Sequence, residues 1–566
     1  ILNCHLATGR IGKPGMGPFS VTGQPNAMGG REVGGLANML ACHLDIENAE
    51  HRAAVKAFWD APRMPDGPGL KAVDMFRAVE EGRIKALWII CTNPAVSMPE
   101  ANRIAAAIES CDFTVVSDLT AETDTARLAD VLLPATGWAE KDGTVTNSER
   151  CISRQRAILP APGAARHDWR ILCDVAHCMG FGAGFDYTSP AEIFREYAAL
   201  SGLAGRLGRD FNISDLSDLS DSDYDALEPF HWPRAGDRQG GRFFARGGFF
   251  HSDGKAKMLP VTHRAPASTP SADYPFRLNT GRVRDHWHTM TRTAMSPRLS
   301  QHVAEPFLEI HPDDAAGLGL APASIAEVTS GHGSALLRVL ISERVQTGQV
   351  FAPMHWTGET APCGRVDALV GAITDPVSGQ PESKASTVAI RPMKAAWFGF
   401  ALCAREFRPQ TDYWARARTR SGWRAELASA KTPADWEDAA RMLFGLGPEA
   451  EAITMIDPTR GAARIAFLEE RLLVAALYAG PEPVAVSRSF LAGRIGDETG
   501  PEILSGRPGA ERPDPGATVC ACFDVGQKTI LEAIRSQRLT SVEAIGTALQ
   551  AGSNCGSCKP ELQALL

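Results

Sequence analysis

The 566-residue sequence contains no run of about 18 consecutive apolar residues, so we expect no membrane-spanning helix. It also lacks an initiator methionine and a signal-peptide pattern, because it begins with ILNCHLATGR. We therefore expect that the beginning of the protein is missing or has been removed by processing. Positive charge is not in excess either: 58 basic and 66 acidic side chains give a net charge of −8, which argues against nucleic acid as a partner.

The sequence has no GxGxxG motif, so it offers no support for ordinary nicotinamide binding. A disulfide framework is not indicated, because nine of the 13 cysteines are scattered without paired spacing. Such cysteines are expected to be reduced, mostly buried thiols in a cytosolic protein, and we predict a cytoplasmic location. The length predicts several domains of about 100–200 residues each. An apolar content of 44% is ordinary for domains with sizeable cores.

Short apolar strands alternate with helical patterns between about residues 70 and 150. The expected strands are 86–91, 112–117 and 129–135. This alternation predicts a parallel, doubly wound, Rossmann-like sheet, in which ligands bind beyond the carboxyl ends of the strands. Asn93 follows one strand, and Ser117 and Asp118 close the next. An aspartate in that place can accept two hydrogen bonds from the amino and imino edge of a guanine.

The most unusual stretch is LNTGRVRDHWHTMTRT, residues 278–293, which is crowded with hydrogen-bond donors. Arginines form forked, charge-assisted bonds to phosphate, hydroxyls and backbone amides add shorter ones, and Gly281 lets the main chain approach a ligand. A loop that clamps a polyanionic ligand has this composition. The alternative is a basic surface loop.

The rest of the chain divides by pattern. Residues 1–275 form a first block, whose glycine-rich start (1–50) predicts loops that pass near a ligand or a flexible linker. Within this block, Ser189 is expected to cap a helix, and DFNISDLSDLSDSDYD (210–225) is expected to be a solvated loop. Short strands between Gly, Pro and Asp turns predict a compact β-barrel at 276–395.

Three further segments follow the barrel. Residues 396–497 are expected to form an α+β segment, and 498–517 a linker, because Pro, Gly and charge occur there without periodicity. In the last segment, 518–566, Cys520 and Cys522 form a CxC pair and Cys555 and Cys558 a CxxC pair, with 32 residues between them. Four thiolates in two tight pairs suit a 2Fe–2S cluster, with a zinc knuckle as the alternative; disulfides fit a cytosolic chain less well.

Four stretches together resemble a known family. They are HLATGRIGKPGMGPFSVTGQPNAMGGREVGG, CTNPAVSMPEANRI, LADVLLPATGWAEKDGTVTNSER and TGRVRDHWHTMTRT. Over nearly its whole length the chain resembles the large catalytic subunits of assimilatory nitrate reductases, in the molybdopterin-guanine-dinucleotide oxidoreductase superfamily. Residues 518–566 resemble a bacterioferritin-associated-ferredoxin type domain, which carries a 2Fe–2S cluster.

The resemblance implies an α/β multidomain fold: a Rossmann-like domain, a barrel of the double-psi kind that holds the cofactor, and a small helical 2Fe–2S domain. It implies a molybdenum bis(molybdopterin guanine dinucleotide) cofactor. The residues at matching positions are Asn93, Ser117, Asp118, Lys141, Asp168, Thr280, Gly281, Arg282, His286, Trp287, His288, Thr289, Met354 and Lys384. Where the family leads us to expect an asparagine, the chain has Asp367, which lacks the amide donor.

The resemblance also implies features that this chain lacks. The family's CxxCxxxC-type run for a 4Fe–4S cluster and its molybdenum-ligating cysteine do not occur here, so we expect a C-terminal portion that is inactive alone and has no catalytic side chain of its own. The implied reaction is reduction of nitrate, with electrons from a ferredoxin, a flavodoxin or a flavoprotein NADH-dependent reductase. The alternatives are a formate dehydrogenase-like enzyme of the same superfamily, a non-catalytic electron-transfer scaffold, and a zinc-bearing interaction module at 518–566.

Overall fold

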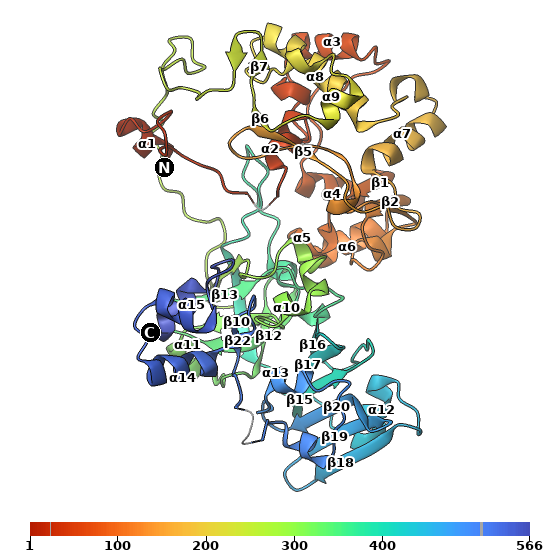
Figure 1. Ribbon diagram of the computed structural model, residues 1–566, viewed down its shortest axis with the longest axis vertical. Coiled ribbons are helices and arrows are strands. Elements are labelled where there is room, and N and C mark those ends of the chain that lie inside the picture. Colours follow the sequence, from red (N-terminus) through yellow and green to blue (C-terminus); the bar gives the residue numbers. More distant parts are fainter. Residues whose placement is uncertain (23, 510–512) are drawn as a thin grey trace.

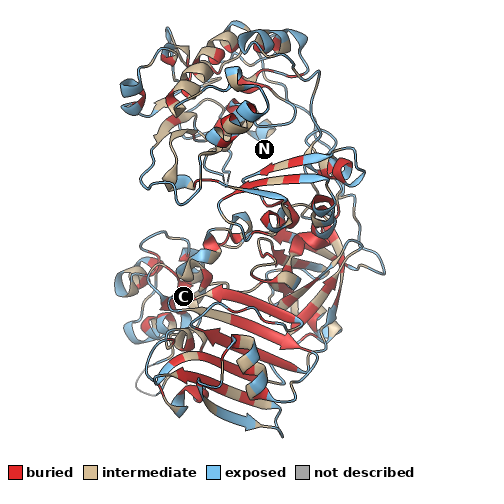
Figure 2. Ribbon diagram, turned by 90° about the vertical axis from the view of Figure 1, so that its right-hand side faces the viewer, coloured by how far each residue is buried: buried red, intermediate tan, exposed pale blue. Residues whose placement is uncertain are grey.

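The structure is a computed structural model that describes residues 1–22, 24–509 and 513–566. The N-terminal half, red to yellow in Figure 1, lies at one end, a green barrel lies in the middle, and a sheet lies at the other end. The C-terminal helices lie beside the barrel rather than beyond the sheet, so the chain turns back toward its centre (Figure 1). In Figure 2 the buried residues concentrate in the strands of the barrel and of the lower sheet.

The expected parallel sheet is present. Its strands, in the order β1-β2-β3, are β1 (Ala86–Ile90), β2 (Phe113–Asp118) and β3 (Val131–Pro134). The helices beside it are α4 (Ala72–Glu80) and α6 (Ala101–Glu109). Apolar side chains such as Phe76, Ile89, Ile104 and Val116 form the core between helices and sheet. Since all the strands run in one direction, the carboxyl ends of β1 and β2 lie together at one edge.

Two short elements extend this region. The sequence TNPAVSM (92–98) predicts a loop, but the structure has a short helix there, α5 (Pro94–Ser97), because Pro94 has a backbone angle suited to a first helical turn. The stretch after β3 contains a hairpin of β4 (Gly143–Thr146) and β5 (Cys151–Gln155). The Asp-Gly pair at 142–143 is a turn signal in the sequence, but β4 begins there, and the turn of the hairpin is at 147–150, with Arg150 at a φ of 72°.

The rest of the N-terminal half is helical, as expected. Its helices are α1 (Leu2–Ala7), α2 (Ala27–Glu32), α3 (Ala49–Phe58), α7 (Asp168–Cys178), α8 (Pro190–Arg206) and α9 (Asp221–Asp225). The predicted cap of α8 is confirmed, because the Ser189 hydroxyl accepts a hydrogen bond from the Glu192 amide. Short strand pairs follow at β6 (Phe230–His231), β7 (Arg234–Ala235) and β8 (Arg238–Gln239).

The prediction of a solvated loop at 210–225 is wrong. This segment contains a 3-10 turn (Ser214–Leu216) and α9, and Phe211 and Ile213 are completely buried against α8. Apolar residues recur at short intervals among its serines and aspartates, which dominate the composition of the segment. Those apolar side chains supply the core of the N-terminal half, and the polar residues cap the turns between them.

A buried carboxylate joins four segments of this half. Glu32, at the end of α2, is fully buried and accepts hydrogen bonds from Thr146 Oγ1 (2.7 Å), Trp232 Nε1 (2.6 Å) and Tyr197 Oη (3.2 Å). Burial raises the pKa of Glu32, while these three donors act in the opposite direction. The carboxylate therefore holds the glycine-rich N-terminal segment against the hairpin and α8.

Residues 276–392 form the expected barrel, closed in the order β10-β12-β11-β14-β9-β13. The strands are β9 (Phe276–Gly281), β10 (Phe307–Ile310), β11 (Ile325–Thr329), β12 (Ser334–Ile341), β13 (Gln349–Pro353) and β14 (Ser386–Pro392), with α10 (Pro297–Ser300) and α11 (Pro312–Leu318) between strands. Alternate apolar residues such as Leu278, Leu308 and Val388 fill its interior. β9 and β13 run parallel, so Gly281 and Pro353 lie side by side where both strands end.

The next segment is an antiparallel sheet in the order β16-β17-β15-β20-β19-β18. Its strands are β15 (Trp397–Cys403), β16 (Tyr413–Arg418), β17 (Trp423–Ser429), β18 (Glu451–Asp457), β19 (Ala462–Glu469) and β20 (Leu472–Gly480). Helix α12 (Trp436–Phe444), capped by Asp435, covers one face. The predicted linker differs in its first part: after α13 (Arg488–Ala492), Ile503 and Leu504 are buried against the other face of the sheet.

Charged side chains are buried where the barrel meets this sheet. Glu426 of β17 is paired with Arg488 (2.9 Å between Oε2 and Nη2) and with Arg338 of β12 (3.6 Å). Burial opposes ionisation of Glu426, but the arginines outweigh it and lower its pKa. Arg338 also contacts Glu305, which accepts a hydrogen bond from Tyr413 Oη. The network ties the two segments together.

The C-terminal segment consists of β21 (Thr518–Cys520), β22 (Val525–Gly526), α14 (Gln527–Gln537), α15 (Val542–Leu549) and α16 (Lys559–Leu565). Ile530, Ile545 and Leu562, one from each helix, are fully buried in its small core. The spacing of apolar residues between the cysteine pairs predicts two short amphipathic helices, and α14 and α15 confirm them. Across the described residues, no helix is both long and apolar enough to cross a bilayer.

Candidate functional site

A cavity of about 540 Å³ lies between the parallel sheet and the loop that follows β9. Its walls include Asn93, Asp118 and Lys141 from the sheet side, and Trp287, His288 and Thr289 from the loop. Gln24, Pro25, Thr136, Trp138 and Arg292 also line it. Six of the side chains singled out from the sequence thus meet in one place, although Asn93 and Thr289, for example, are 196 residues apart.

Asn93 joins the two walls. It follows β1 and is almost fully buried, and its Nδ2 donates to Thr289 Oγ1 at 3.1 Å. Its Oδ1 accepts from the Thr125 hydroxyl (2.7 Å) and amide (3.2 Å). Because both ends of the amide are engaged, Asn93 holds the loop against the sheet.

Ser117 and Asp118 end β2 with different surroundings. Ser117 is buried beneath the cavity, where its hydroxyl accepts a hydrogen bond from Trp88 Nε1 (2.9 Å); its position supports β1 rather than lining the cavity. Asp118 lines the cavity, and Oδ1 accepts from the Leu119 amide at 2.6 Å. Burial raises the pKa of Asp118, and the hydrogen bonds from Leu119 and Thr123 oppose this shift.

Lys141 and Asp168 form a half-buried ion pair with 3.0 Å between Nζ and Oδ2. Asp168 is the first residue of α7, a position where the helix dipole favours negative charge. The Cys91 thiol donates to its other oxygen at 3.4 Å. Asp168 therefore fixes the ammonium of Lys141 at the cavity wall.

The loop wall has an unusual backbone. His288, Thr289 and Met290 have φ angles of 45°, 50° and 60°, in the left-handed region that side chains other than glycine seldom adopt. Each such residue costs about 1–3 kcal/mol, and strain of this kind is concentrated at binding sites. The rings of Trp287 and His288 stack at 4.7 Å, so the strained turn presents a flat aromatic surface to the cavity.

His286 differs from the prediction. It is fully buried, with Nδ1 3.1 Å from Thr293 Oγ1 and Nε2 2.8 Å from the Val303 carbonyl. Its ring also makes an edge contact with Trp356. Because both nitrogens are engaged within the fold, His286 anchors the base of the loop and has no free atom for a ligand. Arg282, by contrast, is exposed.

Four predicted residues meet where β9 and β13 end. Thr280 Oγ1 donates to the Ser383 carbonyl at 2.8 Å, Lys384 Nζ donates to the Thr280 carbonyl, and the Met354 amide donates to the Gly281 carbonyl at 2.8 Å. A Cβ at Gly281 would lie 2.8 Å from the Phe351 ring. Packing within the barrel therefore accounts for this glycine, which we expected to be needed for close approach to a ligand.

His355, which the sequence did not single out, lies near this group. Its Nε2 is buried without a hydrogen-bond partner among the described residues. Burial lowers its pKa to about 4, helped by the positive charges of neighbours that include Arg282, His288 and Lys384. The sequence carried a partial signal, because His355 comes two residues after the end of β13, the strand paired with β9.

Asp367 is a second buried group in this region. It is 8% exposed, in a 3-10 turn (Val366–Leu369) whose apolar residues belong to the barrel core. Burial raises its pKa from 3.8 to about 7, although the charge of Lys384 lowers it. The carboxyl that replaces the expected asparagine is therefore held in surroundings that favour its neutral form.

The residues of the cavity fit a phosphate-bearing ligand with an aromatic base. Two basic side chains, Lys141 and Arg292, line the cavity against one acidic residue, Asp118. The Thr136 hydroxyl, in a fully buried residue of the cavity wall, has no hydrogen-bond partner among the described residues. A buried hydroxyl without a partner costs about 1–3 kcal/mol, and a polar ligand group removes that cost.

The four C-terminal cysteines converge in two pairs. Cys522 Sγ lies 3.4 Å from Cys555 Sγ, and Cys558 interacts with Cys520. Each pair takes one thiol from the CxC motif and one from the CxxC motif. Within the part of the chain that the structure describes, no three His, Cys, Asp or Glu side chains surround one metal position. Two pairs suit two irons with two thiolates each better than a single zinc with four.

The other nine cysteines correct an expectation. We expected them to be mostly buried, but Cys4, Cys91, Cys178 and Cys363 are exposed, Cys111 and Cys151 are intermediate, and Cys42, Cys173 and Cys403 are buried.

Comparison with known families divides the chain into three matched regions. Residues 1–178 match the family described as molybdopterin oxidoreductase, and residues 276–387 match the molydopterin dinucleotide binding domain. Residues 518–566 match the BFD-like 2Fe-2S binding domain.

Three relatives illustrate the similarity. A nitrate reductase of Klebsiella oxytoca is 42% identical over the whole of this chain and 65% of its own length. The assimilatory nitrate reductase catalytic subunit of Bacillus subtilis is 38% identical over 69% of this chain and 54% of its own. The F420-dependent formate dehydrogenase subunit alpha of Methanocaldococcus jannaschii is 34% identical over 68% of this chain and 54% of its own. The chain thus spans between about half and two thirds of the length of these relatives.

Proposed function

Because the chain belongs to the molybdopterin oxidoreductase family, we propose that it is part of a molybdenum-dependent nitrate reductase that reduces nitrate to nitrite in nitrate assimilation. The cavity between the parallel sheet and the loop after β9 carries the proposal. It offers a guanine-binding carboxylate, positive charge for phosphates and an aromatic wall in one place.

Each wall has a task in this proposal. Asp118, at the carboxyl end of β2, accepts hydrogen bonds from the guanine edge of a pterin guanine dinucleotide. Lys141, held by Asp168, and Arg292 neutralise the phosphates. The stacked rings of Trp287 and His288 cover the ligand and limit access of water. The bound molybdenum cofactor supplies the redox chemistry of nitrate reduction.

The C-terminal cysteines complete the proposal. Cys520, Cys522, Cys555 and Cys558 hold a 2Fe–2S cluster that receives electrons from a ferredoxin, a flavodoxin or a flavoprotein NADH-dependent reductase. A 4Fe–4S cluster and a molybdenum ligand are assigned to sequence outside this chain. The exposure of Cys555 supports electron entry at this segment.

Cofactor binding is testable on this chain. Purified protein is denatured, its pterin is oxidised to a fluorescent product, and the released GMP is quantified. We expect Asp118→Asn to lower affinity by about 5- to 150-fold, because a bidentate contact to guanine is worth about 1–3 kcal/mol. Asp112→Asn is the matched control, since Asp112 is an exposed carboxylate at the other end of the same strand. Equal nucleotide content in D118N and wild type refutes the assignment of the cavity.

The activity is tested on protein that includes the flanking coding sequence. Oxidation of reduced methyl viologen by nitrate is expected, and growth with tungstate in place of molybdate should abolish it. The formate dehydrogenase relative, at 34% identity, makes formate oxidation the second candidate. A molybdenum-containing preparation that oxidises formate and leaves nitrate unchanged would establish that second function instead.

A further inference from the structure

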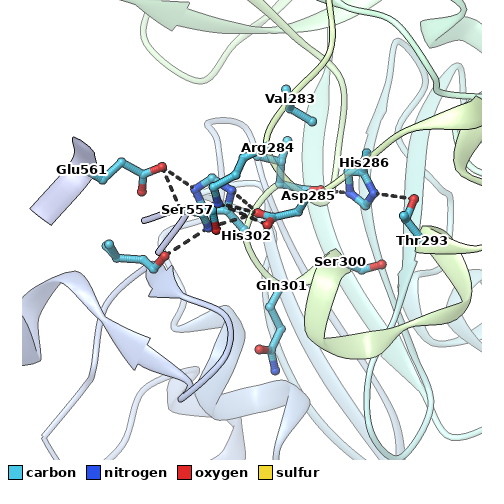
Figure 3. Close-up of polar contacts among 12 residues, drawn as sticks. Val283, Arg284, Asp285, His286, Thr293, Ser300, Gln301, His302, Ser557 and Glu561 are labelled. Carbon is cyan, nitrogen blue, oxygen red and sulfur yellow. Dashed lines mark hydrogen bonds and ion pairs between the residues drawn. The ribbon is translucent and has the colours of Figure 1, made fainter. Parts of the chain in front are cut away.

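The C-terminal segment contacts the barrel through charged side chains, and Figure 3 shows these meeting at one point. Arg284, in the loop after β9, reaches Glu561 of α16 (3.1 Å between Nη1 and Oε1) and donates to the Val519 carbonyl (3.1 Å). His302 contacts the same Glu561 oxygen at 3.3 Å through Nε2. Asp285 pairs with both Arg284 (3.0 Å) and His302 (2.8 Å).

This contact is not an ordinary surface ion pair. The side chains of Arg284, Asp285 and His302 are 14%, 8% and 17% exposed, so water screens them poorly, whereas Glu561 is 41% exposed. Burial lowers the pKa of His302, but its hydrogen bonds to Asp285 and Glu561 outweigh that effect and raise the pKa, which favours the protonated ring beside two carboxylates. A network that shares its charges in this way holds one geometry better than isolated pairs do.

The network touches the C-terminal segment next to the cluster cysteines. Val519 precedes Cys520, and α16, which carries Glu561, begins directly after Cys558. Cys520 and Cys558 are 2% and 3% exposed, whereas Cys522 is half-buried and Cys555 is exposed. One pair of thiols therefore lies on the inner side of the segment and the other on its outer side.

The barrel end of the network leads to the cavity. Arg284 and Asp285 are three and two residues before Trp287, in the loop whose next residues line the cavity wall. His286, between them, anchors the loop to Thr293 and Val303. The part of the loop that contacts the C-terminal segment, Arg284 and Asp285, is thus continuous in sequence with the part that lines the cavity, which begins at Trp287.

We propose that Arg284, Asp285, His302 and Glu561 form a seat that fixes the 2Fe–2S domain in one orientation on the barrel, with the buried Cys520–Cys558 pair on the side of the cavity loop, Cys522 at a cavity that Arg298, Gln301 and Arg420 also line, and Cys555 exposed. The seat residues are positioning residues, since they touch neither thiol pair directly in this arrangement. The inference rests on the proposed 2Fe–2S cluster, and it holds whichever substrate the enzyme reduces.

Hydrogen–deuterium exchange of the iron-loaded chain, followed by mass spectrometry, tests the seat. In Arg284→Gln and Glu561→Gln, peptides covering 282–302 and 559–566 should exchange about 5-fold faster or more, because the poorly exposed Arg284 and His302 lose a charged partner, while water compensates part of the loss at the 41% exposed Glu561. Peptides from β19 should not change. Arg535→Gln is the matched control, since Arg535 is an exposed arginine on α14 of the same segment.

Two further readouts separate docking from folding. The visible absorbance of the cluster should persist in R284Q and E561Q, which shows that the C-terminal segment is still folded. A soluble dysprosium chelate should relax the electron paramagnetic resonance of the dithionite-reduced cluster more strongly in both variants, because undocking exposes the Cys520–Cys558 side. The effect of the double variant should be smaller than the sum of the two single effects, since both substitutions remove the Arg284–Glu561 contact.

The results that would refute the proposed seat differ from the results that would refute the proposed nitrate reductase activity. Wild-type exchange and relaxation in R284Q and E561Q would show that the segment is held by other contacts. Loss of cluster absorbance in both variants would show that the network belongs to the fold of the cluster site and is not a docking contact. Neither result depends on turnover, so an enzyme inactive toward nitrate leaves the test intact.

Discussion

Replacing Asp367 by asparagine should stabilise the barrel, and the gain should depend on pH. Burial raises the pKa of Asp367 from 3.8 to about 7, so the folded barrel binds this proton more tightly than the unfolded chain. For a raised carboxyl pKa, stability falls as pH rises from the unfolded to the folded value. The carboxyl therefore costs nothing below about pH 3.8 and its full penalty is reached above pH 7.

The magnitude follows from the shift. About three pKa units at 1.36 kcal/mol each give a penalty of about 4 kcal/mol above pH 7. Asparagine has nearly the same shape and carries no charge at any of these pH values, so D367N escapes the penalty. The free energy of opening the barrel should rise in D367N relative to wild type by about 1.4 kcal/mol per pH unit between pH 5 and 7, and then level off.

Hydrogen exchange of the slowest amides in β11 and β14 measures this opening energy in the whole chain, after correction for the intrinsic effect of pH on exchange. Asp313→Asn serves as control, because Asp313 is in the same barrel segment and its side chain is 83% exposed. A D367N gain that is equal at pH 5 and pH 8, or a matching slope in D313N, would refute the reasoning.

Three further substitutions test other parts of the fold. Glu426→Ala should destabilise the sheet after the barrel by about 3 kcal/mol, because the buried carboxylate is lost to both Arg338, which is 11% exposed, and the partly exposed Arg488; urea unfolding measures this, and a loss below 1 kcal/mol contradicts it. Glu32→Ala should cost about 3 kcal/mol or more, since three buried donors lose their acceptor, and thermal unfolding of the N-terminal half should show it. Ser189→Ala should cost about 1 kcal/mol, visible as faster exchange confined to the first turn of α8; unchanged exchange there argues against the cap.

Local patterns predicted the elements of this fold well where each element carries its own signal. The strands of the parallel sheet and the barrel are short apolar runs, the Ser189 cap is a local hydrogen bond, and CxC with CxxC announces a metal site. The prediction failed at 210–225, where serine and aspartate dominate the composition. The apolar residues of that segment find their partners on α8 and on distant strands, and no local pattern records such partners.

The residue types of the candidate site could be predicted from the sequence, but not which of its side chains face the cavity. The stretch 278–293 is rich in hydrogen-bond donors, but they have different roles in the structure. His286 makes hydrogen bonds that anchor the loop, whereas Trp287, His288 and Thr289 line the cavity. This difference in direction follows from a strained backbone, because consecutive residues of the loop have positive φ angles, which these residue types do not favour. The sequence therefore shows how many donors the loop contains, and the structure shows which of them face the cavity.

Contacts between distant segments explain what remained hidden. Arg284 and Glu561 are 277 residues apart, and nothing in either neighbourhood announces the other. A charged residue in a donor-rich loop is equally compatible with a ligand, a solvated surface or a partner domain, because all three satisfy its hydrogen bonds. The structure decides among them by burial: Arg282 is exposed, whereas Arg284, two residues later, is enclosed by Asp285, Glu561 and the Val519 carbonyl. The loop after β9 therefore contacts the C-terminal segment at Arg284 and lines the cavity from Trp287 onward. A substitution in one of these two parts should alter the other, because the anchored residue His286 joins them.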